Sequence, residues 1–378
     1  MDTQYASAPI VKIKVLGIGG AGNNSINRMI EEVEKGLDLP GVDFVAMNTD
    51  KAVLNINKAP IKLCIGEKLT RGFGAGSNPD VGQRAAEESA EEIRNLLEGS
   101  DIVFLTAGMG GGTGTGAAPV IASIARELGI LTVAVVTKPF DFEGGHRILN
   151  ADIGINNLSK FVDSTLVVPN QKLIEKLPKT GMREAFRIAD EVLRQGVLGV
   201  AELIVTPMMI NPDFADISMV LRGAGLTHMG IGRAKGEDRL LQAIRQAVAS
   251  PLLETSINGA TRIIMCIKGG EDLDLHEVSN CGTLVRDVVD PGCNIIFGAD
   301  IVPDMEDEVQ IMIIAAGFPK QGGLQQEQTA IMSNGLDPFT GKADEQALEH
   351  TEKEETDPNE NLPPYLKKML QQNAKNKI

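Results

Sequence analysis

The stretch TAGMGGGTGTGAAP, residues 106–119, follows a short apolar run and precedes a segment with helical periodicity. Six of the nine residues from 108 to 116 are glycines, which costs more backbone entropy on folding than a simple connector would require. Consecutive backbone N–H groups in such a turn can form an anion-binding nest, and the hydroxyls of Thr113 and Thr115 can bond phosphate oxygens. The stretch therefore predicts a phosphate-binding turn, the 108–116 turn, that joins a strand to a helix.

A second glycine-rich turn, GIGGAG at residues 17–22, also follows an apolar run and opens a helical pattern. It fits the spacing GxGxxG, in which glycines let the backbone approach a pyrophosphate at a helix N-terminus. The same spacing occurs in plain strand-to-helix turns and in NAD-dependent oxidoreductases. An oxidoreductase needs an acidic residue about 20 positions further on, and Asp50 comes later than that. Two phosphate-type turns, in a chain without the motif GxxxxGK[ST], favour a di- or triphosphate ligand.

Short apolar runs alternate with longer segments of helical periodicity from residue 10 onward. The predicted strands are apolar on both faces, which is typical of a parallel sheet with helices on both sides. The alternation restarts after about residue 225 and predicts a second, smaller α/β domain. Beyond Phe318 the sequence becomes rich in Gln, Asn, Glu and Gly and predicts a linker. We expect strands over residues 10–17, 42–48, 101–107, 131–137, 262–267, 294–301 and 309–316, and helices over 23–35, 78–97, 115–128, 183–206, 238–249 and 275–289.

The charge of the 378-residue chain is strongly acidic, with 36 basic and 51 acidic residues and a net of −15. The acidity extends over the body and over residues 325–361, whereas residues 362–378 contain four lysines and no acid. Such a chain is a poor candidate for coating nucleic acid, since phosphate neutralisation needs clustered cations. An acidic body that binds a nucleotide must use backbone amides instead, and the glycine turns supply them.

Membrane and metal signals are weak in this sequence. No apolar stretch approaches the roughly 18 residues of a membrane span, and the N-terminus lacks the basic and apolar regions of a secretory signal. The cysteines Cys64, Cys266, Cys281 and Cys293 form no CxxC pair, which favours reduced thiols in a cytosolic protein. We therefore expect no direct membrane insertion and no protein-built metal site.

Further motifs accompany the two glycine turns. Together with TAGMGGGTGTGAAPVIA at 106–122, these motifs resemble those of the tubulin/FtsZ family of GTPases, in particular its bacterial cell-division members. The similarity extends from about residue 10 to residue 318. The motifs are GIGGAGNNSINRMI (17–30), VAMNTD (45–50), LTRGFGAGSNPDVG (69–82), KPFDFEGGHR (138–147), REAFRIADEVLRQGV (183–197), NPDFADI (211–217), MGIGRAKGEDR (229–239) and ASPLLE (249–254).

The resemblance implies the α/β fold of that family: a Rossmann-like parallel-sheet GTP-binding domain, a central helix, and a smaller second α/β domain that activates the GTPase. A disordered acidic linker and a C-terminal peptide would follow. The peptide, LPPYLKK from Leu362 to Lys368, resembles the family segment that docks on membrane-adaptor and regulatory proteins. The implied boundaries are 10–182, 183–206, 207–319, 320–361 and 362–378.

The resemblance also implies where GTP, as the substrate, and GDP would bind. Mg²⁺ is expected through the phosphates and water. From the residues alone, Phe186 is better interpreted as a core residue, and Glu143 with Arg147 as a surface ion pair. The resemblance instead makes Phe186 a stacking face for guanine and Asp190 an acceptor for its N–H groups. The implied nucleotide-binding positions are Gly20, Ala21, Gly22, Asn23, Asn24, Ala75, Gly76, Gly112, Thr113, Gly114, Glu143, Arg147, Asn170, Phe186 and Asp190.

The segment NPDFADI has two interpretations. From the residues alone it is a helix start, with Asp213 as the N-cap and Asp216 in the first turn. The resemblance implies that Asn211, Asp213 and Asp216 are catalytic, and that they enter the nucleotide pocket of the next subunit to position the attacking water. Hydrolysis would then require a head-to-tail contact, and such a contact generates a filament when it does not close.

Together these observations predict a tubulin-like GTPase that polymerises into the cytokinetic ring of bacteria, in the cytoplasm at midcell. A plasmid-partitioning filament of the same superfamily is an alternative, and an NAD-dependent oxidoreductase is an alternative of a different class.

Overall fold

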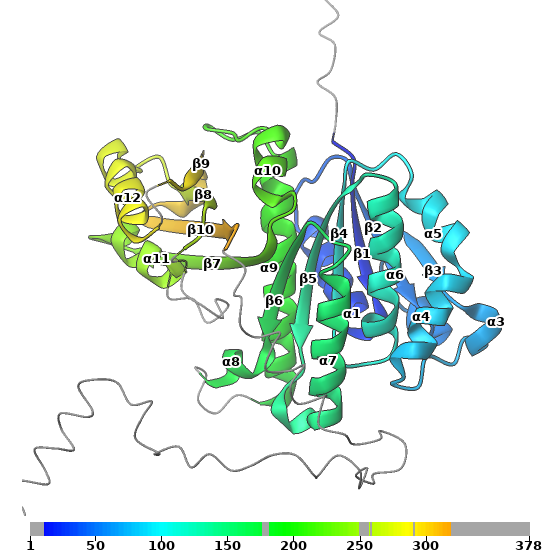
Figure 1. Cartoon of the computed structure of the whole chain (residues 1–378). Helices are drawn as coiled ribbons and strands as arrows, with labels where there is room; N and C mark the ends of the chain where they lie inside the picture. The colour runs from blue at the N-terminus through cyan, green and yellow to red at the C-terminus, as the bar shows by residue number, and fades with distance from the viewer. Residues whose placement is uncertain (1–10, 176–180, 249–256, 258, 290–291, 319–378) are drawn as a thin grey trace, which may run out of the picture. The chain divides into compact units, whose positions relative to one another are not determined.

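The computed structural model describes residues 11–175, 181–248, 257, 259–289 and 292–318. A ten-stranded sheet runs through these residues in the order β3-β2-β1-β4-β5-β6-β7-β10-β8-β9 (Figure 1). The strands from β3 to β6 are parallel, and the start of β7 continues this pattern beside β6. The rest of β7 pairs antiparallel with β10, β10 pairs antiparallel with β8, and β8 and β9 are parallel. The strands are β1 (Ile13–Ile18), β2 (Val42–Asn48), β3 (Ile61–Cys64), β4 (Ile102–Gly108), β5 (Leu131–Lys138), β6 (Ser164–Pro169), β7 (Gly225–Lys235), β8 (Arg262–Gly269), β9 (Asn294–Ile301) and β10 (Glu308–Ala316).

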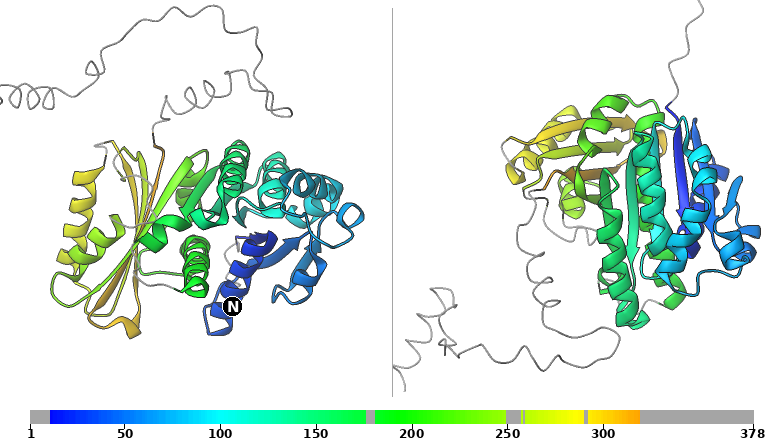
Figure 2. Two further views of the ribbon diagram at one scale, coloured as in Figure 1. Left: turned by 90° about the horizontal axis from the view of Figure 1, so that it is seen from below. Right: turned by 45° about the vertical axis from the view of Figure 1, so that its right-hand side comes forward.

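Helices cover both faces of the parallel part of the sheet (Figure 2). Successive strand residues point to opposite faces, so Ile13 and Val15 of β1 join the core beneath α1 and α9, whereas Leu16 and Ile18 join the core beneath α4 to α7. This two-sided burial is why the strands are apolar throughout. The helices are α1 (Gly19–Glu34), α2 (Lys51–Asn55), α3 (Glu67–Thr70), α4 (Pro79–Glu88), α5 (Ala90–Leu97), α6 (Thr113–Glu127), α7 (Gly145–Leu158), α8 (Asn170–Glu175), α9 (Met182–Val205), α10 (Phe214–Leu221), α11 (Arg239–Val248) and α12 (Leu275–Val288).

The C-terminal strands β8 to β10 are also buried on both faces. One face packs against α11 and α12 through residues such as Ile263 and Ile313. The other face contributes Ile264 and Ile314 to the same core that contains α9 and α10. The helix α9 therefore packs against both parts of the sheet, and it begins and ends within one residue of the expected central helix, 183–206. The domain boundaries themselves stay a prediction.

The predicted helix over 78–97 is wrong in one respect, because it is two helices, α4 and α5. The break falls at Ser89, which is buried and whose hydroxyl accepts a hydrogen bond from the N–H of Gly66 at 3.1 Å. The start of α4 agrees with the sequence, since Asn78 caps it and Pro79 occupies its first turn.

The α/β fold class predicted from the sequence is confirmed. Several elements were not predicted, among them β3, β6, β7 and the helices α2 and α7. The helices α1 and α6 begin at Gly19 and Thr113, four and two residues earlier than expected, because the glycine turns themselves form the first helical turns. The predicted linker and C-terminal peptide, and the motif at 249–254, lie outside the described residues. Among the described helices, none is both long enough and apolar enough to cross a membrane.

Candidate active site

The two glycine turns lie side by side because β1 and β4 are neighbouring parallel strands, with Ile18 opposite Ala107. Glycine is required where the turns touch. A Cβ on Gly22 would lie 2.3 Å from the carbonyl oxygen of Thr106, and a Cβ on Gly19 would lie 3.0 Å from the backbone nitrogen of Gly114. The backbone N–H groups that begin α1 and α6 therefore converge at the carboxyl edge of the sheet. This is where ligands bind in open α/β sheets.

A cavity of about 360 Å³, the glycine-turn cavity, opens at this point. It brings together ten of the fifteen nucleotide-binding positions predicted from the sequence. At one end are the backbone atoms of the two turns, and at the other are side chains from α7, α8 and α9. The ten are Gly20, Ala21, Gly112, Thr113, Gly114, Glu143, Arg147, Asn170, Phe186 and Asp190.

The other five predicted positions, Gly22, Asn23, Asn24, Ala75 and Gly76, do not line the glycine-turn cavity. Asn23 is fully buried, and its amide nitrogen, oriented to satisfy its neighbours, donates to the carbonyl oxygen of Met47 at 2.9 Å. It thus ties α1 to β2. Asn24 is exposed on α1. Ala75 and Gly76 directly precede a residue of the cavity wall, Ser77.

The two threonines of the 108–116 turn differ in their contacts. Thr113 lines the glycine-turn cavity, and its hydroxyl oxygen lies 2.7 Å from that of Thr49. Thr115 is buried, and its hydroxyl accepts a hydrogen bond from the N–H of Gly110 at 2.8 Å. Gly110 has a φ of +102°, which an L side chain rarely adopts. Thr115 does not line the glycine-turn cavity and stabilises the turn from within, so the expectation that its hydroxyl bonds a phosphate stays a prediction.

An aromatic cluster lies at the start of α9, and one of its three rings, Phe186, lines the cavity. The ring of Phe186 is 40% exposed and meets Phe140 edge-on, with centroids 5.1 Å apart. Phe142 is more exposed and stacks on Phe140, with centroids 5.3 Å apart. The interpretation of Phe186 as a core residue is therefore wrong, since a closed core would not leave its ring accessible.

Two polar groups beside these rings lack a full set of partners. Asn170 is buried, and its side-chain oxygen has no hydrogen-bond partner within the described part of the chain. Asp190 lies one turn further along α9 and accepts a hydrogen bond from Arg28 Nε at 3.1 Å. Burial raises the pKa of the Asp190 carboxyl above its ordinary value, and the adjacent guanidinium of Arg28 opposes that rise. An unpaired buried oxygen and a desolvated carboxylate beside an open ring point to a bound polar aromatic group.

Glu143 and Arg147 form an ion pair at the mouth of the cavity, with Nη1 and Oε2 2.7 Å apart. Glu143 is also held by the backbone, because its Oε1 accepts a hydrogen bond from the N–H of Phe140 at 3.0 Å. The pair predicted from the residues alone is present, and it also lines the cavity. Arg147 places a cation next to the 108–116 turn.

The predicted catalytic residues lie elsewhere. Asp213 caps α10, and its Oδ1 accepts a hydrogen bond from the N–H of Asp216 at 2.7 Å, as predicted for a helix start. The segment after α10 hydrogen-bonds to Asp163, which precedes β6, so α10 adjoins the edge where the parallel strands begin (Figure 1). The cavity lies at the opposite edge. The helix α9, about 36 Å long at 1.5 Å per residue, lines the cavity near its start, and Asp213 follows its far end.

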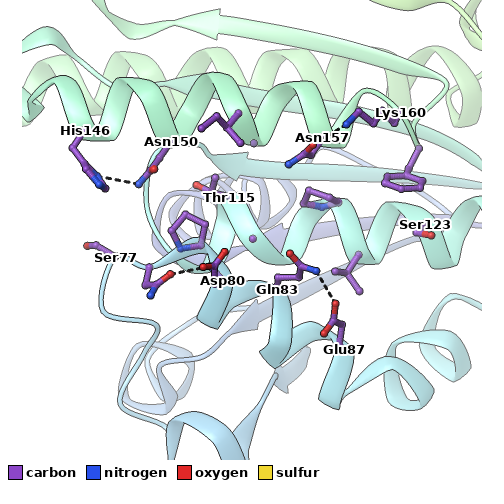
Figure 3. A pocket seen from close by; sticks show the side chains of 18 residues that line it. Ser77, Asp80, Gln83, Glu87, Thr115, Ser123, His146, Asn150, Asn157 and Lys160 are labelled. Carbon is purple, nitrogen blue, oxygen red and sulfur yellow. Dashed lines mark hydrogen bonds between the residues drawn. The ribbon is translucent and has the colours of Figure 1, made fainter. Parts of the chain in front are cut away.

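A larger groove of about 900 Å³ runs between α4, α6 and α7 (Figure 3). Its polar side chains are mostly paired with neighbours on their own helix. Gln83 donates to Glu87 at 2.8 Å, and His146 and Asn150 are 3.2 Å apart. Unlike the smaller cavity, the groove is lined by no buried side-chain oxygen that lacks a partner within the described part of the chain.

Some residues of the site were not singled out from the sequence. Arg28 partners Asp190 from α1, and Phe140 and Phe142 surround Phe186. All three residues fall within the motifs GIGGAGNNSINRMI and KPFDFEGGHR. Their contacts could not be predicted from the sequence, because the residues that they contact are far away along the chain. Among the described residues, no three His, Cys, Asp or Glu side chains gather to hold a metal.

The fold and the cavity define a nucleotide-phosphate-binding α/β protein, and comparison with known proteins specifies which. Residues 12–178 match the model of the tubulin/FtsZ family GTPase domain, and residues 225–319 match that of the FtsZ family C-terminal domain. A solved FtsZ dimer from M. jannaschii is 45% identical, with a TM-score of 0.77, over 83% of this chain and 90% of that one. The chain belongs to the tubulin/FtsZ family and is a GTPase of that family.

More distant relatives share the fold. CetZ1 from Haloferax volcanii, solved as a GDP-bound monomer, is 23% identical with a TM-score of 0.73, over 85% of this chain and 99% of that one. CetZ2 from the same organism, solved as a GTPγS-bound protofilament, is 21% identical with a TM-score of 0.70. The match covers 85% of this chain and 98% of that one. The family assignment argues against the oxidoreductase alternative.

Proposed function

We propose that GTP binds in the glycine-turn cavity with its phosphates over the two turns and its base between Phe186 and Asp190. Backbone N–H groups at two helix N-termini supply the phosphate contacts in an acidic chain. The unpaired oxygen of Asn170 supports a ligand with N–H donors. Mg²⁺ would be held by the phosphates and water, since the described residues build no carboxylate cluster for it.

Asp190 would select guanine over adenine. A carboxylate only accepts hydrogen bonds, and guanine presents two N–H donors on the edge where adenine presents an acceptor. One Asp190 oxygen is engaged by Arg28, which holds the carboxylate in place from the neighbouring helix. Arg28 would therefore be a positioning residue for base recognition.

This role predicts a pH dependence of GTP binding. Burial raises the pKa of Asp190. The affinity for GTP should therefore be at its maximum above that raised pKa, where the carboxyl is ionised. It should then fall by up to about tenfold per pH unit as pH drops through the pKa, since protonation places a hydrogen on one oxygen and leaves fewer acceptor sites for the two guanine N–H groups. Calorimetric titration from neutral to acidic pH measures this profile.

Two variants serve as controls. Arg28→Gln should move the loss of GTP affinity to higher pH, because the guanidinium of Arg28 lowers the pKa of Asp190. Asp190→Asn should bind weakly at every pH, and a wild-type profile in Asp190→Asn would show that another group titrates.

The hydrolytic site would be completed between two subunits. The observation that carries this proposal is the placement of Asn211, Asp213 and Asp216 at the sheet edge opposite the cavity, which one protomer cannot bring together. A loop from one subunit would enter the cavity of the next and position water at the γ-phosphate. Such a head-to-tail contact is heterologous and builds a filament. Light scattering with GTP and with GDP at rising protein concentration tests it, because only GTP should produce scattering above a threshold concentration.

The cellular role that fits this chemistry is a filament scaffold for bacterial cytokinesis, in the cytoplasm at midcell. The similarity to FtsZ over most of the chain supports it. Membrane-adaptor and regulatory proteins would bind the C-terminal peptide, from Leu362 to Lys368. Imaging of the tagged protein in dividing cells tests the role, and a position away from the division site would contradict it.

Deletion of residues 362–378 should separate assembly from partner binding. We expect the truncated chain to retain GTP hydrolysis and GTP-dependent light scattering, because the cavity and the α10 loop lie in the described body. Co-sedimentation with membrane adaptors should be lost. Loss of filaments on deletion would instead assign the peptide to assembly.

A further inference from the structure

The loop of residues 206–213, which connects α9 to α10, pairs with the edge strand β9. This strand is the last of the sheet and has β8 on one side. On its other side, Ile210 forms an isolated antiparallel bridge with Ala299. The N–H of Ile210 donates to the carbonyl oxygen of Ala299 at 2.9 Å, and the N–H of Ala299 donates to that of Ile210 at 3.0 Å. Two backbone hydrogen bonds therefore attach the loop to the C-terminal strands.

Pro212 packs on β9 two residues beyond this bridge. It is buried, whereas its neighbours Asn211 and Asp213 are exposed. A Cβ on Gly298 would lie 3.2 Å from Cδ and 3.3 Å from Cγ of the proline ring, which is tighter than side chains normally pack. The φ of Gly298 lies outside the left-handed region, so its own backbone does not require glycine. Glycine inside a strand is typical of a place where another segment approaches closely, and here that segment is the proline ring.

The helix α10, which follows the loop, is also held at its C-terminal end. Arg262 at the start of β8 donates from Nη1 to the carbonyl oxygens of Met219 at 2.9 Å and of Arg222 at 3.1 Å. Carbonyl groups in the last turn of a helix have no partner within it. Ile217 and Val220 are fully buried in the core that α10 shares with α9 and β8. Because both ends of α10 are attached, a shift of the proline ring falls on the residues beside it.

We propose that Pro212 and Gly298 position Asn211 and Asp213 for the hydrolysis of GTP bound to the next subunit. This inference rests on the proposed function, in which the loop 206–213 completes the cavity of a neighbouring chain. The buried ring fixes the distance of the loop from β9, and the two residues that flank the ring are exposed for contact with that neighbour. Neither Pro212 nor Gly298 carries a group that can act on water or phosphate, so both are positioning residues.

The reaction is sensitive to displacements of this size. Phosphoryl transfer is catalysed mainly by positioning and by charge stabilisation, and a misplacement of about 1 Å can reduce its rate about 100-fold. A Cβ on Gly298 requires its neighbour to move by a few tenths of an ångström. The pyrrolidine ring is rigid and cannot rotate away, so the loop itself must move.

Steady-state GTP hydrolysis by the full-length chain, well above the assembly threshold, tests the positioning. Gly298→Ala should lower kcat about tenfold, and its GTP affinity in calorimetry should be that of the wild type. Pro212→Ala should lower kcat by less, about threefold, because the loop loses a contact but meets no clash. When both changes are combined, the new methyl group occupies the space that the ring leaves. The kcat of the double variant should then return to within about twofold of the wild type, above both single variants.

Gly269→Ala is the matched control for the added methyl group. Gly269 ends β8, and a Cβ there would also lie 3.2 Å from another atom. That atom is Cδ1 of Leu273, the end of a flexible side chain that does not belong to the loop. The control variant should hydrolyse GTP at the wild-type rate. Thermal unfolding of each variant measures folding separately, and Gly298→Ala should retain the melting temperature of the wild type.

Two results would overturn the positioning role. One is a wild-type kcat in Gly298→Ala, or losses that simply multiply in the double variant. The other is a joint fall of kcat, GTP affinity and melting temperature in Gly298→Ala, which would assign the contact to folding. If Gly298→Ala does not fold, Pro212→Gly tests the same contact from the loop, and a wild-type kcat there would contradict the proposal.

A reference variant separates this inference from the proposed function. Wild-type hydrolysis by Asp213→Ala would refute the site divided between subunits, and the positioning with it. Loss of hydrolysis in Asp213→Ala, together with a wild-type kcat in Gly298→Ala, would refute the positioning alone.

Discussion

Replacement of Asp213 by Ala is expected to abolish GTP hydrolysis while leaving GTP affinity unchanged. The carboxylate lies beyond the far end of α9 and does not line the cavity, so it should contribute nothing to binding in its own subunit. In the wild type, phosphate release per subunit should rise with protein concentration, because each active site needs two chains. A turnover per subunit that does not change with concentration would contradict the divided site.

A second variant separates catalysis from helix capping. The Asp213 side chain accepts a hydrogen bond from the N–H of Asp216, and loss of such a cap typically costs about 1 kcal/mol of stability. Asp213→Asn keeps a capping oxygen and removes the charge. We expect the Asp213→Asn variant to lose GTP hydrolysis as fully as the Asp213→Ala variant, but to retain the melting temperature of the wild type. Hydrolysis by Asp213→Asn at the wild-type rate would assign the residue to capping alone.

Replacement of Gly20 by Ala is expected to weaken GTP binding about 100-fold, the effect of losing phosphate contacts worth roughly 3 kcal/mol. Gly20 lines the cavity, and a Cβ there would meet no protein atom within 4 Å. The added methyl would occupy space that a close phosphate needs, without straining the fold. Binding is measured by calorimetry and stability by thermal unfolding.

Gly282→Ala is the matched control for this change. It adds the same methyl group in open space, on α12, where Ala favours the helix by about 0.5–1 kcal/mol. Its GTP affinity should be that of the wild type. Normal GTP affinity in Gly20→Ala would place the phosphates elsewhere than over the 17–22 turn.

The two defective proteins should complement each other when mixed. Asp213→Ala retains the cavity, and Gly20→Ala retains the α10 loop, so about one contact in four of a random head-to-tail filament would contain both intact halves. Hydrolysis by the mixture should therefore exceed the sum of the separate proteins. A mixture no more active than that sum would indicate a site complete within one chain.

Much of the fold was accessible from the sequence because its signals are local. The glycines of the 17–22 and 108–116 turns, the doubly apolar strands and the cap at Asn78 each act within a few residues, and each predicted element type agrees with the structure. The break at Ser89 was missed, and the contact that its hydroxyl makes with Gly66, 23 positions away, leaves no local pattern in the sequence. The strand β7 was missed because it pairs with β6 at one end and β10 at the other, a role without a local pattern.

The sequence by itself determined that this chain carries two glycine turns on a parallel sheet, since close backbone approach excludes side chains larger than hydrogen, and it predicted phosphate as their ligand. Only the tertiary structure decided which side chains share the cavity. Parallel pairing of β1 with β4 joins the two turns, and packing of α1 on α9 brings Arg28 to Asp190. The length of α9 then holds Asp213 at the far edge, because a helix advances by a fixed rise per residue and cannot fold back.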